Sequence, residues 1–342
     1  MANEIIQNKK LPNVLEEAIE ISDFITMDVP SRPIILDPWL RESSLVMIYA
    51  ERGIGKTWLG LSIAFSIVTG QPIGNWEIIN PVGVLYIDGE VSADEMQDRM
   101  KKLSAGLSPR SAPLRILSSD LLHQNDFASV NLCDLSWRKN FYDALKKQQE
   151  IKVLILDNLS CLTPGIEEND KVAWDDINQW LISLRFLGIA VIFLHHAGKG
   201  GKQRGTSGRE DALNVVINLS KPPGHKQSDG AKFIVSFEKS RGVCGNSLSP
   251  FTFSIGKDEK GNTVWLTDRV NSSNNKGLII ALLGEGKSPN EIISEVECTK
   301  QNISKHKQWA IEKGFLSEDG KSGVCRFTEK GREKYGAYLD DI

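Results

Sequence analysis

The stretch Leu45-Val-Met-Ile-Tyr-Ala-Glu-Arg-Gly-Ile-Gly-Lys-Thr57 is an apolar run followed by a short turn with two glycines, and an apolar helical pattern begins at Trp58. Glycines let the backbone turn so tightly that successive N–H groups face one anion, and a helix N-terminus adds positive potential at the same point. The pattern predicts a strand, a phosphate-binding loop over residues 50–57 and a helix. The alternative is an ordinary glycine-containing turn between a strand and a helix.

Several residues of this loop are expected to contact a nucleoside triphosphate. Lys56 would reach the β- and γ-phosphates, the Thr57 hydroxyl would bind Mg²⁺, and the N–H of Trp58 would serve the α-phosphate. Ala50 stands where such loops usually have their first glycine. We therefore expect ATP and Mg²⁺ as ligands, with hydrolysis of the ATP. The predicted cofactor-binding residues of the loop are Arg52, Gly53, Ile54, Gly55, Lys56, Thr57 and Trp58.

A second apolar run, Lys152–Asp157, ends in an acid that we expect to hold the magnesium through water. An acid that only caps the next turn is the alternative reading of Asp157. Many ATPases place a catalytic glutamate directly after this aspartate, but the chain has Asn158 there. The group that orients the attacking water must therefore come from elsewhere.

Glu90 is the best candidate for this catalytic base. It follows the run Gly83–Asp88, and strands next to the phosphate-loop strand end at the same edge of a parallel sheet. Ser92 and Glu95 are expected to form the capping box of the next helix, so capping does not account for Glu90. The alternative is a solvated loop acid.

Two adjacent histidines, His195 and His196, end another apolar run. Neighbouring histidines can bind a metal, but no third histidine or carboxylate lies at a useful spacing. We expect a polar group that senses the γ-phosphate, with a purely structural role as the alternative.

Apolar runs that alternate with helical patterns indicate an α/β fold. Runs that are apolar on both faces and separated by helices are typical of a parallel sheet covered on both sides. Three later runs are expected to close one edge of this sheet. The runs expected to form the parallel strands are Leu45–Ala50, Gly83–Asp88, Leu114–Leu117, Lys152–Asp157 and Ile189–Leu194. The three later runs are Leu213–Leu219, Lys232–Phe237 and Asn262–Leu266.

Composition limits the other function classes. The 342 residues carry a net charge of −3, so no global basic field draws the chain to nucleic acid. The five cysteines form no C-x-x-C pair, which argues against a zinc site and fits a reducing cytosol. No signal peptide or apolar run of about 20 residues is evident, and we expect a cytoplasmic protein.

The middle of the chain resembles the RecA-type ATPases and, among them, the RepA-like hexameric helicases of plasmids and phages. The resemblance covers roughly residues 24–256, and its motifs occur in the order found in the family. These motifs are Ala50–Thr57, Tyr86-Ile-Asp-Gly-Glu90, Leu156-Asp-Asn-Leu-Ser160, His195-His-Ala-Gly-Lys199, Arg204-Gly-Thr-Ser207 and Phe237-Glu-Lys-Ser-Arg241.

The resemblance implies a homo-oligomeric ring, expected to be a hexamer, with ATP sites between subunits. A neighbouring subunit would then supply a cation that stabilises transition-state charge, and Lys239 and Arg241 match that element. A pair of surface cations on a late strand is the alternative.

The same resemblance implies that the glycine-rich segment Ala197–Gly208 faces the ring channel and grips single-stranded DNA. Lys199, Lys202 and Arg204 would hold the phosphates without sequence preference. The alternative is a flexible surface loop.

The pattern along the chain indicates three segments and a short linker. Residues 1–35 are interpreted as an arm, residues 36–270 as a RecA-like ATPase domain, and residues 271–275 as a linker. Residues 276–342 resemble a winged helix with three short helices, at residues 276–283, 289–296 and 300–313, and a hairpin over residues 315–327. Its third helix would offer polar groups to duplex DNA, and docking of a protein is the alternative. The predicted DNA-binding residues of this helix are Lys300, Gln301, Ser304 and Lys305.

The expected function is therefore an ATP-dependent DNA helicase or translocase of a plasmid, phage or mobile element. An ATP-switched DNA-binding regulator or loader without unwinding activity is the alternative. A recombination mediator that forms filaments on DNA is the third possibility.

Overall fold

The computed structural model describes residues 15–166, 171–197, 212–222, 225–226, 230–269, 275–296, 300–320 and 323–339. The chain divides into two compact units, Met1–Asp268 and Arg269–Ile342. Each unit has its own hydrophobic core, and we describe each by itself.

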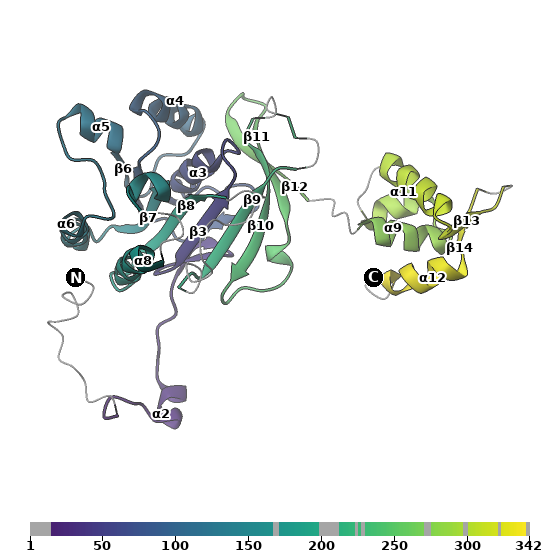
Figure 1. Ribbon diagram of the computed structural model, residues 1–342, viewed down its shortest axis with the longest axis horizontal. Coiled ribbons are helices and arrows are strands. Elements are labelled where there is room, and N and C mark those ends of the chain that lie inside the picture. The colour runs from purple at the N-terminus through teal and green to yellow at the C-terminus, as the bar shows by residue number, and fades with distance from the viewer. Residues whose placement is uncertain are drawn as a thin grey trace. The chain divides into compact units, whose positions relative to one another are not determined.

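The large unit is built on a mixed sheet whose nine described strands lie in the order β12-β11-β10-β9-β3-β8-β7-β5-β6 (Figure 1). The strands from β9 to β6 run parallel to one another, whereas β10 is antiparallel to both β9 and β11. The bounds are β3 Leu45–Ala50, β5 Gly83–Asp88, β6 Leu114–Ser118, β7 Ile151–Asp157, β8 Ala190–His196, β9 Val215–Ser220, β10 Lys232–Ser240, β11 Phe251–Lys257 and β12 Thr263–Arg269.

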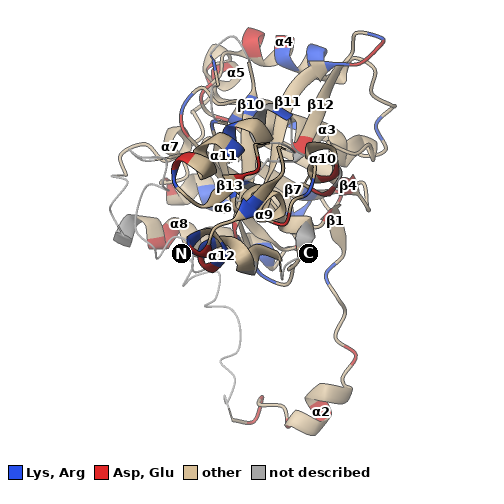
Figure 2. Ribbon diagram, turned by 90° about the vertical axis from the view of Figure 1, so that its right-hand side faces the viewer, with Lys and Arg blue, Asp and Glu red and all other residues tan. Residues whose placement is uncertain are grey.

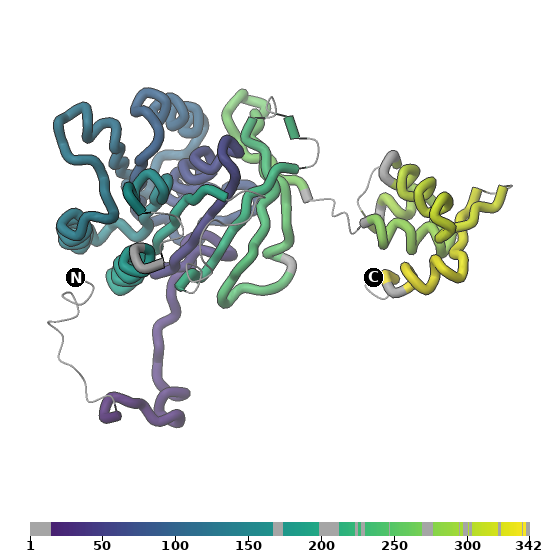
Figure 3. The backbone as a smooth tube through the Cα atoms, viewed as in Figure 1, coloured from purple at the N-terminus to yellow at the C-terminus, as the bar shows by residue number. Residues whose placement is uncertain are grey.

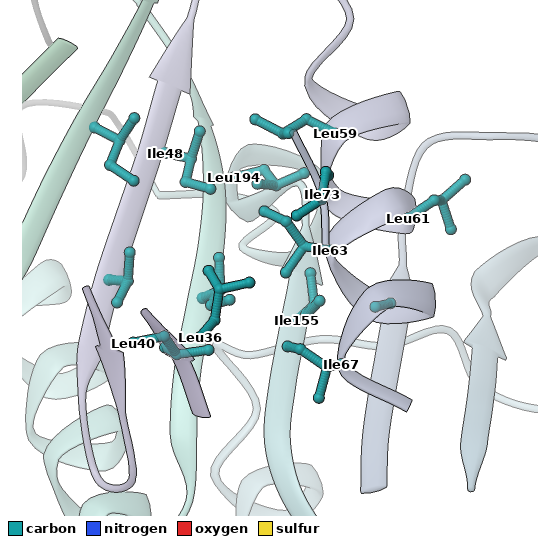
Figure 4. Packing of buried hydrophobic residues seen from close by; sticks show 14 of the residues in the cluster. Leu36, Leu40, Ile48, Leu59, Leu61, Ile63, Ile67, Ile73, Ile155 and Leu194 are labelled. Carbon is teal, nitrogen blue, oxygen red and sulfur yellow. The ribbon is translucent and has the colours of Figure 1, made fainter. Parts of the chain in front are cut away.

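Helices cover both faces of the parallel strands. One face packs against α3 (Lys56–Thr69) and α4 (Ala93–Ser104), where Ile63 and Ile67 of α3 meet strand residues such as Ile155 (Figure 4). The other face packs against α6 (Leu135–Lys146), α7 (Leu159–Leu162) and α8 (Lys171–Arg185). Alternate strand residues belong to the two clusters, because successive side chains of a strand point to opposite faces.

Smaller elements complete the large unit. A three-stranded sheet joins β2, β1 and β4, and α2 lies in the segment before it. The remaining bounds are α2 Ile21–Thr26, β1 Ile34–Asp37, β2 Leu40–Arg41, β4 Glu77–Ile78, α5 Ser119–Gln124 and the 3₁₀ turn η3 Asn246–Leu248.

The α/β fold with a mainly parallel sheet and helices on both faces is confirmed, and two expectations are corrected. The strand β11, between β10 and β12, was not predicted, because Phe251–Lys257 has only one clear face of apolar residues. The strand β5, which precedes Glu90, does not lie next to β3; β8 and β7 separate them.

The described part of the small unit contains the helices α9, α10, α11 and α12 and a hairpin between α11 and α12, and Figure 3 traces its backbone. The bounds are α9 Asn275–Gly284, α10 Pro289–Val296, α11 Lys300–Glu312, β13 Leu316–Glu318, β14 Cys325–Phe327, α12 Glu329–Tyr335 and the 3₁₀ turn η4 Gly336–Leu339. The helix α12 was not predicted, although Thr328 caps it by accepting a hydrogen bond from the Gly331 N–H at 3.0 Å. Its sequence has few apolar residues, so periodicity gave little signal.

Candidate functional site

The turn between β3 and α3 has the backbone that an anion-binding loop requires. Gly55 is the N-cap of α3 with φ of 118°, and a Cβ atom there would lie 2.7 Å from the Cβ of Ala231. Only glycine fits this conformation and this close contact. No side chain caps α3, so the first N–H groups of the helix can serve an anion at its N-terminus.

A cavity of about 350 Å³ opens in front of this helix end. Most of the predicted nucleotide-site residues line it, which brings the ends of β3, β5, β7 and β8 to one place. The predicted residues in its wall are Gly53, Gly55, Lys56, Thr57, Trp58, Glu90, Asp157 and His196. The sequence correctly indicated that the loop after β5 reaches this site, although β5 is not the neighbour of β3.

Lys56 is buried, with only 6% of its surface exposed. Its Nζ donates to the carbonyl oxygens of Ala50 and Glu51, each at 3.1 Å, and lies 3.1 Å from His196 Nδ1. Burial lowers the pKa of Lys56 to about 8, although the charges of Asp157 and Glu90 act in the opposite direction. An anion bound in the cavity would restore the charged form of this lysine.

Asp157 is also buried, and burial raises the pKa of its carboxyl group. Tyr86 Oη donates to Asp157 Oδ2 at 2.7 Å, and Thr57 forms a second side-chain hydrogen bond with the same carboxylate. These contacts fix the orientation of Asp157 beside Thr57. Together with phosphate oxygens and waters, the two side chains are suited to the octahedral oxygen shell that Mg²⁺ prefers.

No group of three or more metal-binding side chains occurs among the described residues.

A polar chain connects Lys56 to Glu90. His196 Nδ1 lies 3.1 Å from Lys56 Nζ, and its Nε2 lies 3.8 Å from Glu90 Oε2. Asn158 Nδ2 donates to Glu90 Oε2 and lies 3.2 Å from His196 Nε2. Asn158 is fully buried and its Oδ1 accepts the Cys161 N–H at 3.1 Å, so α7 holds the amide in place. From the sequence, Asn158 was noted only because it stands where many ATPases have a catalytic glutamate.

Three predicted cofactor-binding residues lie away from this cavity. Arg52 and Ile54 line an adjoining cavity of about 500 Å³, together with Lys221 and His225. His195 lies on the opposite face of the sheet from His196, because consecutive residues of β8 alternate between faces. Only His196 of the pair therefore reaches the loop.

The predicted trans-acting cations lie at the other edge of the sheet. Ser240 pairs with Val215 at the start of β9, and Val215 pairs with Val46 at the start of β3. Lys239 precedes Ser240, and Arg241 follows it with its N–H bonded to the Asn214 carbonyl at 2.8 Å. Both cations are therefore separated from the phosphate loop of their own chain by the length of β3.

Two further features of the site escaped the sequence interpretation. Arg99 of α4 lines the cavity, 3.5 Å from Glu95 Oε2 and with its guanidinium carbon 5.9 Å from the ring centre of Trp58. Asp88 is fully buried beside Asp157 in the register of β5 and β7, and burial raises its pKa to about 7. Its Oδ2 accepts the Val91 N–H at 3.1 Å, which shapes the turn that carries Glu90. The signal in the sequence was that Asp88, like Asp157, is an acid at the end of an apolar run.

The predicted capping box of α4 is not formed. Ser92 is the N-cap residue, but its side chain makes no capping hydrogen bond to the helix. The Ala93 N–H is instead bonded to Asp120 Oδ2 at 2.8 Å, from the start of α5. A tertiary contact thus replaces the local one, and Glu95 lines the cavity.

Some of the predicted DNA-binding residues are described in the structure and others are not. Lys199, Lys202 and Arg204 lie outside the described residues, as does the side chain of Gln301. Lys300, Ser304 and Lys305 are exposed on α11, and the latter two line a shallow recess with Gln308, Trp309 and Glu312.

Comparison with known proteins agrees with this geometry. A family model described as AAA domain, AAA_25, matches residues 13–202, or 190 of the 342 residues. Among the described residues, no helix is long and apolar enough to cross a membrane. Comparison with curated proteins gave no match.

Three solved structures are similar to the chain at low identity. A KaiC-like protein of Pyrococcus horikoshii OT3 is 15% identical over 69% of this chain and 98% of its own, with a TM-score of 0.45. The flagellar accessory protein FlaH of Methanocaldococcus jannaschii is 16% identical over 65% and 89%, with a TM-score of 0.41. The RadB recombinase is 16% identical over 67% and 91%, with a TM-score of 0.42. From the family match and the phosphate loop at the end of β3, we conclude that the chain belongs to the AAA domain family of P-loop ATPases and has a RecA-like fold.

Proposed function

We propose that this chain is an ATP-dependent DNA translocase or helicase that hydrolyses ATP between the subunits of a ring, expected to be a hexamer. ATP and Mg²⁺ would bind in the cavity lined by Lys56, Thr57 and Asp157. The bound magnesium would neutralise charge on the β- and γ-phosphates during hydrolysis. A plasmid, phage or mobile element is the expected setting.

The observation that carries the proposal is the place of Lys239 and Arg241. Their strand end pairs with the start of β9, whereas the phosphate loop follows the end of β3. From Val46 to Ala50 alone the strand rises by about 13 Å. Neither cation can therefore serve the site of its own chain, and a role at an ATP site requires a neighbouring subunit.

Glu90 is suited to orient the attacking water. It lies in the wall of the cavity with Lys56 and Asp157, and Asn158 donates to one of its oxygens. The other carboxylate oxygen is left for a water molecule. Because His196 contacts both Lys56 and Asn158, a bound γ-phosphate that draws Lys56 away would alter this polar chain.

The proposed DNA contact follows from the same histidine. The segment Ala197–Gly208, which contains Lys199, Lys202 and Arg204, begins directly after His196. Its first residue, Ala197, donates its N–H to the Ala50 carbonyl at 2.8 Å. Changes at the γ-phosphate would thus act at the base of this segment. Repeated around a ring, its three cations would form a basic belt for single-stranded DNA.

The small unit is proposed to be a winged helix that binds duplex DNA through α11. Lys300, Ser304 and Lys305 are exposed on that helix. Lys276 stacks over the Trp309 ring at 3.0 Å, and burial together with Lys334 and Lys305 lowers its pKa. Mutual repulsion of these cations favours a bound polyanion.

The test combines DNA dependence with subunit mixing. ATP turnover by the full chain should rise on addition of single-stranded DNA, with displacement of an annealed strand. Arg241→Ala should keep nucleotide binding but lose roughly 10³-fold or more in turnover. Mixing Arg241→Ala with Glu90→Gln subunits should restore part of the activity, because some interfaces then contain both intact groups.

Each alternative predicts another result. No recovery on mixing would contradict a shared site. Hydrolysis that ignores DNA would instead support an ATP-switched regulator or loader, and DNA-coated filaments seen by microscopy would support a recombination mediator.

A further inference from the structure

The strand β10 has a one-residue bulge directly before the cations proposed to act on a neighbouring subunit. Phe237 pairs with Ile217 of β9 and Lys239 pairs with Val216, so Glu238 is the extra residue between the two pairs. Without the bulge, Lys239 would pair one residue closer to the start of β9. Because successive side chains of a strand alternate between faces, the bulge also moves Lys239 to the opposite face of the sheet. This is the face covered by α6, α7 and α8, to which Val216 belongs.

The side chain of the bulged residue is held by the two strands beside β10. Tyr49 Oη donates to Glu238 Oε1 at 2.5 Å, and Asn218 Nδ2 donates to the same oxygen at 3.1 Å. The charged residues of β10 are Lys232, Glu238 and Lys239, and Figure 2 shows acids and bases in separate colours on the ribbon. Hydrogen bonds to a carboxylate are shorter and stronger than those between neutral groups, so this contact fixes the geometry of the bulge.

A purely stabilising role does not account for this contact. Glu238 is exposed, so water would solvate its carboxylate equally well in the absence of Tyr49. A hydrogen bond exchanged for one with water contributes little to the free energy of unfolding. Bulges are over-represented beside active sites, where they change the direction of a side chain. The contact is therefore better explained by the residues that follow Glu238 on the strand.

The same contact connects the two strands that the proposed mechanism uses. Tyr49 stands directly before Ala50, whose carbonyl accepts from Lys56 Nζ at 3.1 Å in the nucleotide site of this chain. Glu238 stands three residues before Arg241, which is proposed to serve the site of the neighbouring subunit. One hydrogen bond thus joins the phosphate-loop strand of one site to the strand that carries the cations for the next.

We propose that Glu238 is a positioning residue for Lys239 and Arg241. Held by Tyr49 and Asn218, it keeps the bulge that sets the register and the face of both cations. A displacement of about 1 Å far from the chemistry can lower a rate by roughly 100-fold, so the bulge matters for turnover. The inference rests on the shared ATP site in the proposed function and deepens it by naming the contact that places the cations.

The first experiment compares full-length variants in turnover and in nucleotide binding. Glu238→Ala should lower ATP turnover by roughly tenfold, because the bulge loses its anchor. Its affinity for a non-hydrolysable ATP analogue with Mg²⁺ should change by less than about twofold, since Glu238 does not line the nucleotide cavity of its own chain. Glu238→Gln keeps an oxygen acceptor and should retain most of the turnover. The matched control is Glu259→Ala, which removes an exposed acid from the turn between β11 and β12.

Subunit mixing then tests on which side of the interface Glu238 acts. Glu238→Ala mixed with Glu90→Gln should regain turnover, because some interfaces then combine an intact Glu90 with well-placed cations. Glu238→Ala mixed with Arg241→Ala should regain none, because both changes damage the same side of every interface. A general defect in folding would not produce this pattern.

The role of the hydrogen bond itself is tested at its other end. Tyr49→Phe keeps the buried ring and removes the donor, so it should lower turnover as Glu238→Ala does, and the double variant should lose little more. If Glu238→Ala fails to fold, Tyr49→Phe takes its place in the mixing experiment.

Three results would overturn the proposal. One is turnover of Glu238→Ala within about twofold of the unaltered chain. Another is recovery on mixing with Arg241→Ala, and the third is a loss of nucleotide affinity equal to the loss of turnover. The reference mixture of Arg241→Ala with Glu90→Gln distinguishes this inference from the proposed function. If that mixture does not recover, the shared site is wrong and the inference with it. If it recovers while Glu238→Ala behaves as the unaltered chain does, only the role of Glu238 is wrong.

Discussion

The nucleotide edge of the large unit and the surface of the small unit distribute their charges in opposite ways. The nucleotide edge is the sheet edge where β3, β5, β7 and β8 end at the cavity. There Lys56, Asp88 and Asp157 are at most 6% exposed, and each forms hydrogen bonds with neighbouring groups. In the small unit, an apolar core that includes Ile280 and Ile292 is fully buried, and the lysines lie outside it. Burial makes each charge at the nucleotide edge costly and strongly coupled, whereas the ion pairs of the small unit lie near the surface, where solvent screens them.

The largest expected effect comes from removing the most buried cation. Lys56→Ala should lower ATP turnover by at least roughly 100-fold, because Nζ is the buried cation of the phosphate loop itself, whereas Arg99 reaches the same cavity from α4. The melting temperature should stay unchanged or rise, since the substitution also removes a buried charge whose pKa is lowered to about 8. Turnover and thermal unfolding are measured together, with the exposed Lys102→Ala as the control. A large fall in melting temperature would contradict the view that Lys56 is held there at a cost.

How far the sequence could anticipate this site depended on whether a feature is local. The phosphate loop is a local motif, so the place of Lys56 and Thr57 between β3 and the first turn of α3 could be predicted from residue order alone. The placement of Asp157 and Glu90 in one site required only that parallel strands end at one edge, and the cavity does contain both residues. Strand order was out of reach, because β8 and β7 come later in the chain than β5 and yet lie between it and β3.

The features that were missed depend on tertiary contacts. Asp120 takes the place of Ser92 at the start of α4, and no pattern within residues 92–95 could reveal a partner in another helix. The two histidines look equivalent in the sequence, but only the alternation of β8 sends His196 to the loop and His195 away from it. Arg99 likewise reaches the cavity because α4 packs on α3, one turn after Glu95.

A second prediction concerns Arg99, which is less buried than Lys56. Its side chain is 22% exposed and lines the same cavity. Arg99→Ala should raise the KM for ATP by roughly tenfold with a smaller change in kcat, because a charge-assisted contact to the bound nucleotide is lost. Steady-state kinetics with Arg99→Lys should show partial recovery. An unchanged KM would mean that Arg99 serves only to pack against Trp58 and Glu95.

A third prediction uses pH to titrate the buried lysine without mutation. The nucleotide-free pKa of Lys56 is about 8, and a bound triphosphate stabilises the charged form, so the bound pKa must be higher. Affinity for ATP should therefore be greatest below pH 8 and should fall above it, by at most tenfold per pH unit. The ligand contributes no change there, because the second pKa of its phosphate is about 6. Calorimetry in two buffers of different ionisation enthalpy should detect proton uptake above pH 8, and its absence would contradict the lowered pKa.

The smallest expected effect lies in the small unit. Lys305→Ala should weaken binding of duplex DNA only severalfold, since one exposed cation releases about one counterion, and the slope of log K against log salt should fall by about one. The matched control is Lys287→Ala, because Lys287 is paired with Glu295 of α10. ATP turnover without DNA should be the same in both variants. If Lys305→Ala instead lowered the affinity for DNA by roughly 100-fold, as Lys56→Ala is expected to lower ATP turnover, the charges of the small unit would be as coupled as those of the nucleotide edge.

The salt dependence gives a second check. Equal salt slopes for Lys305→Ala and Lys287→Ala would show that α11 does not contact phosphates, and docking of a protein would then be the better interpretation of its exposed face.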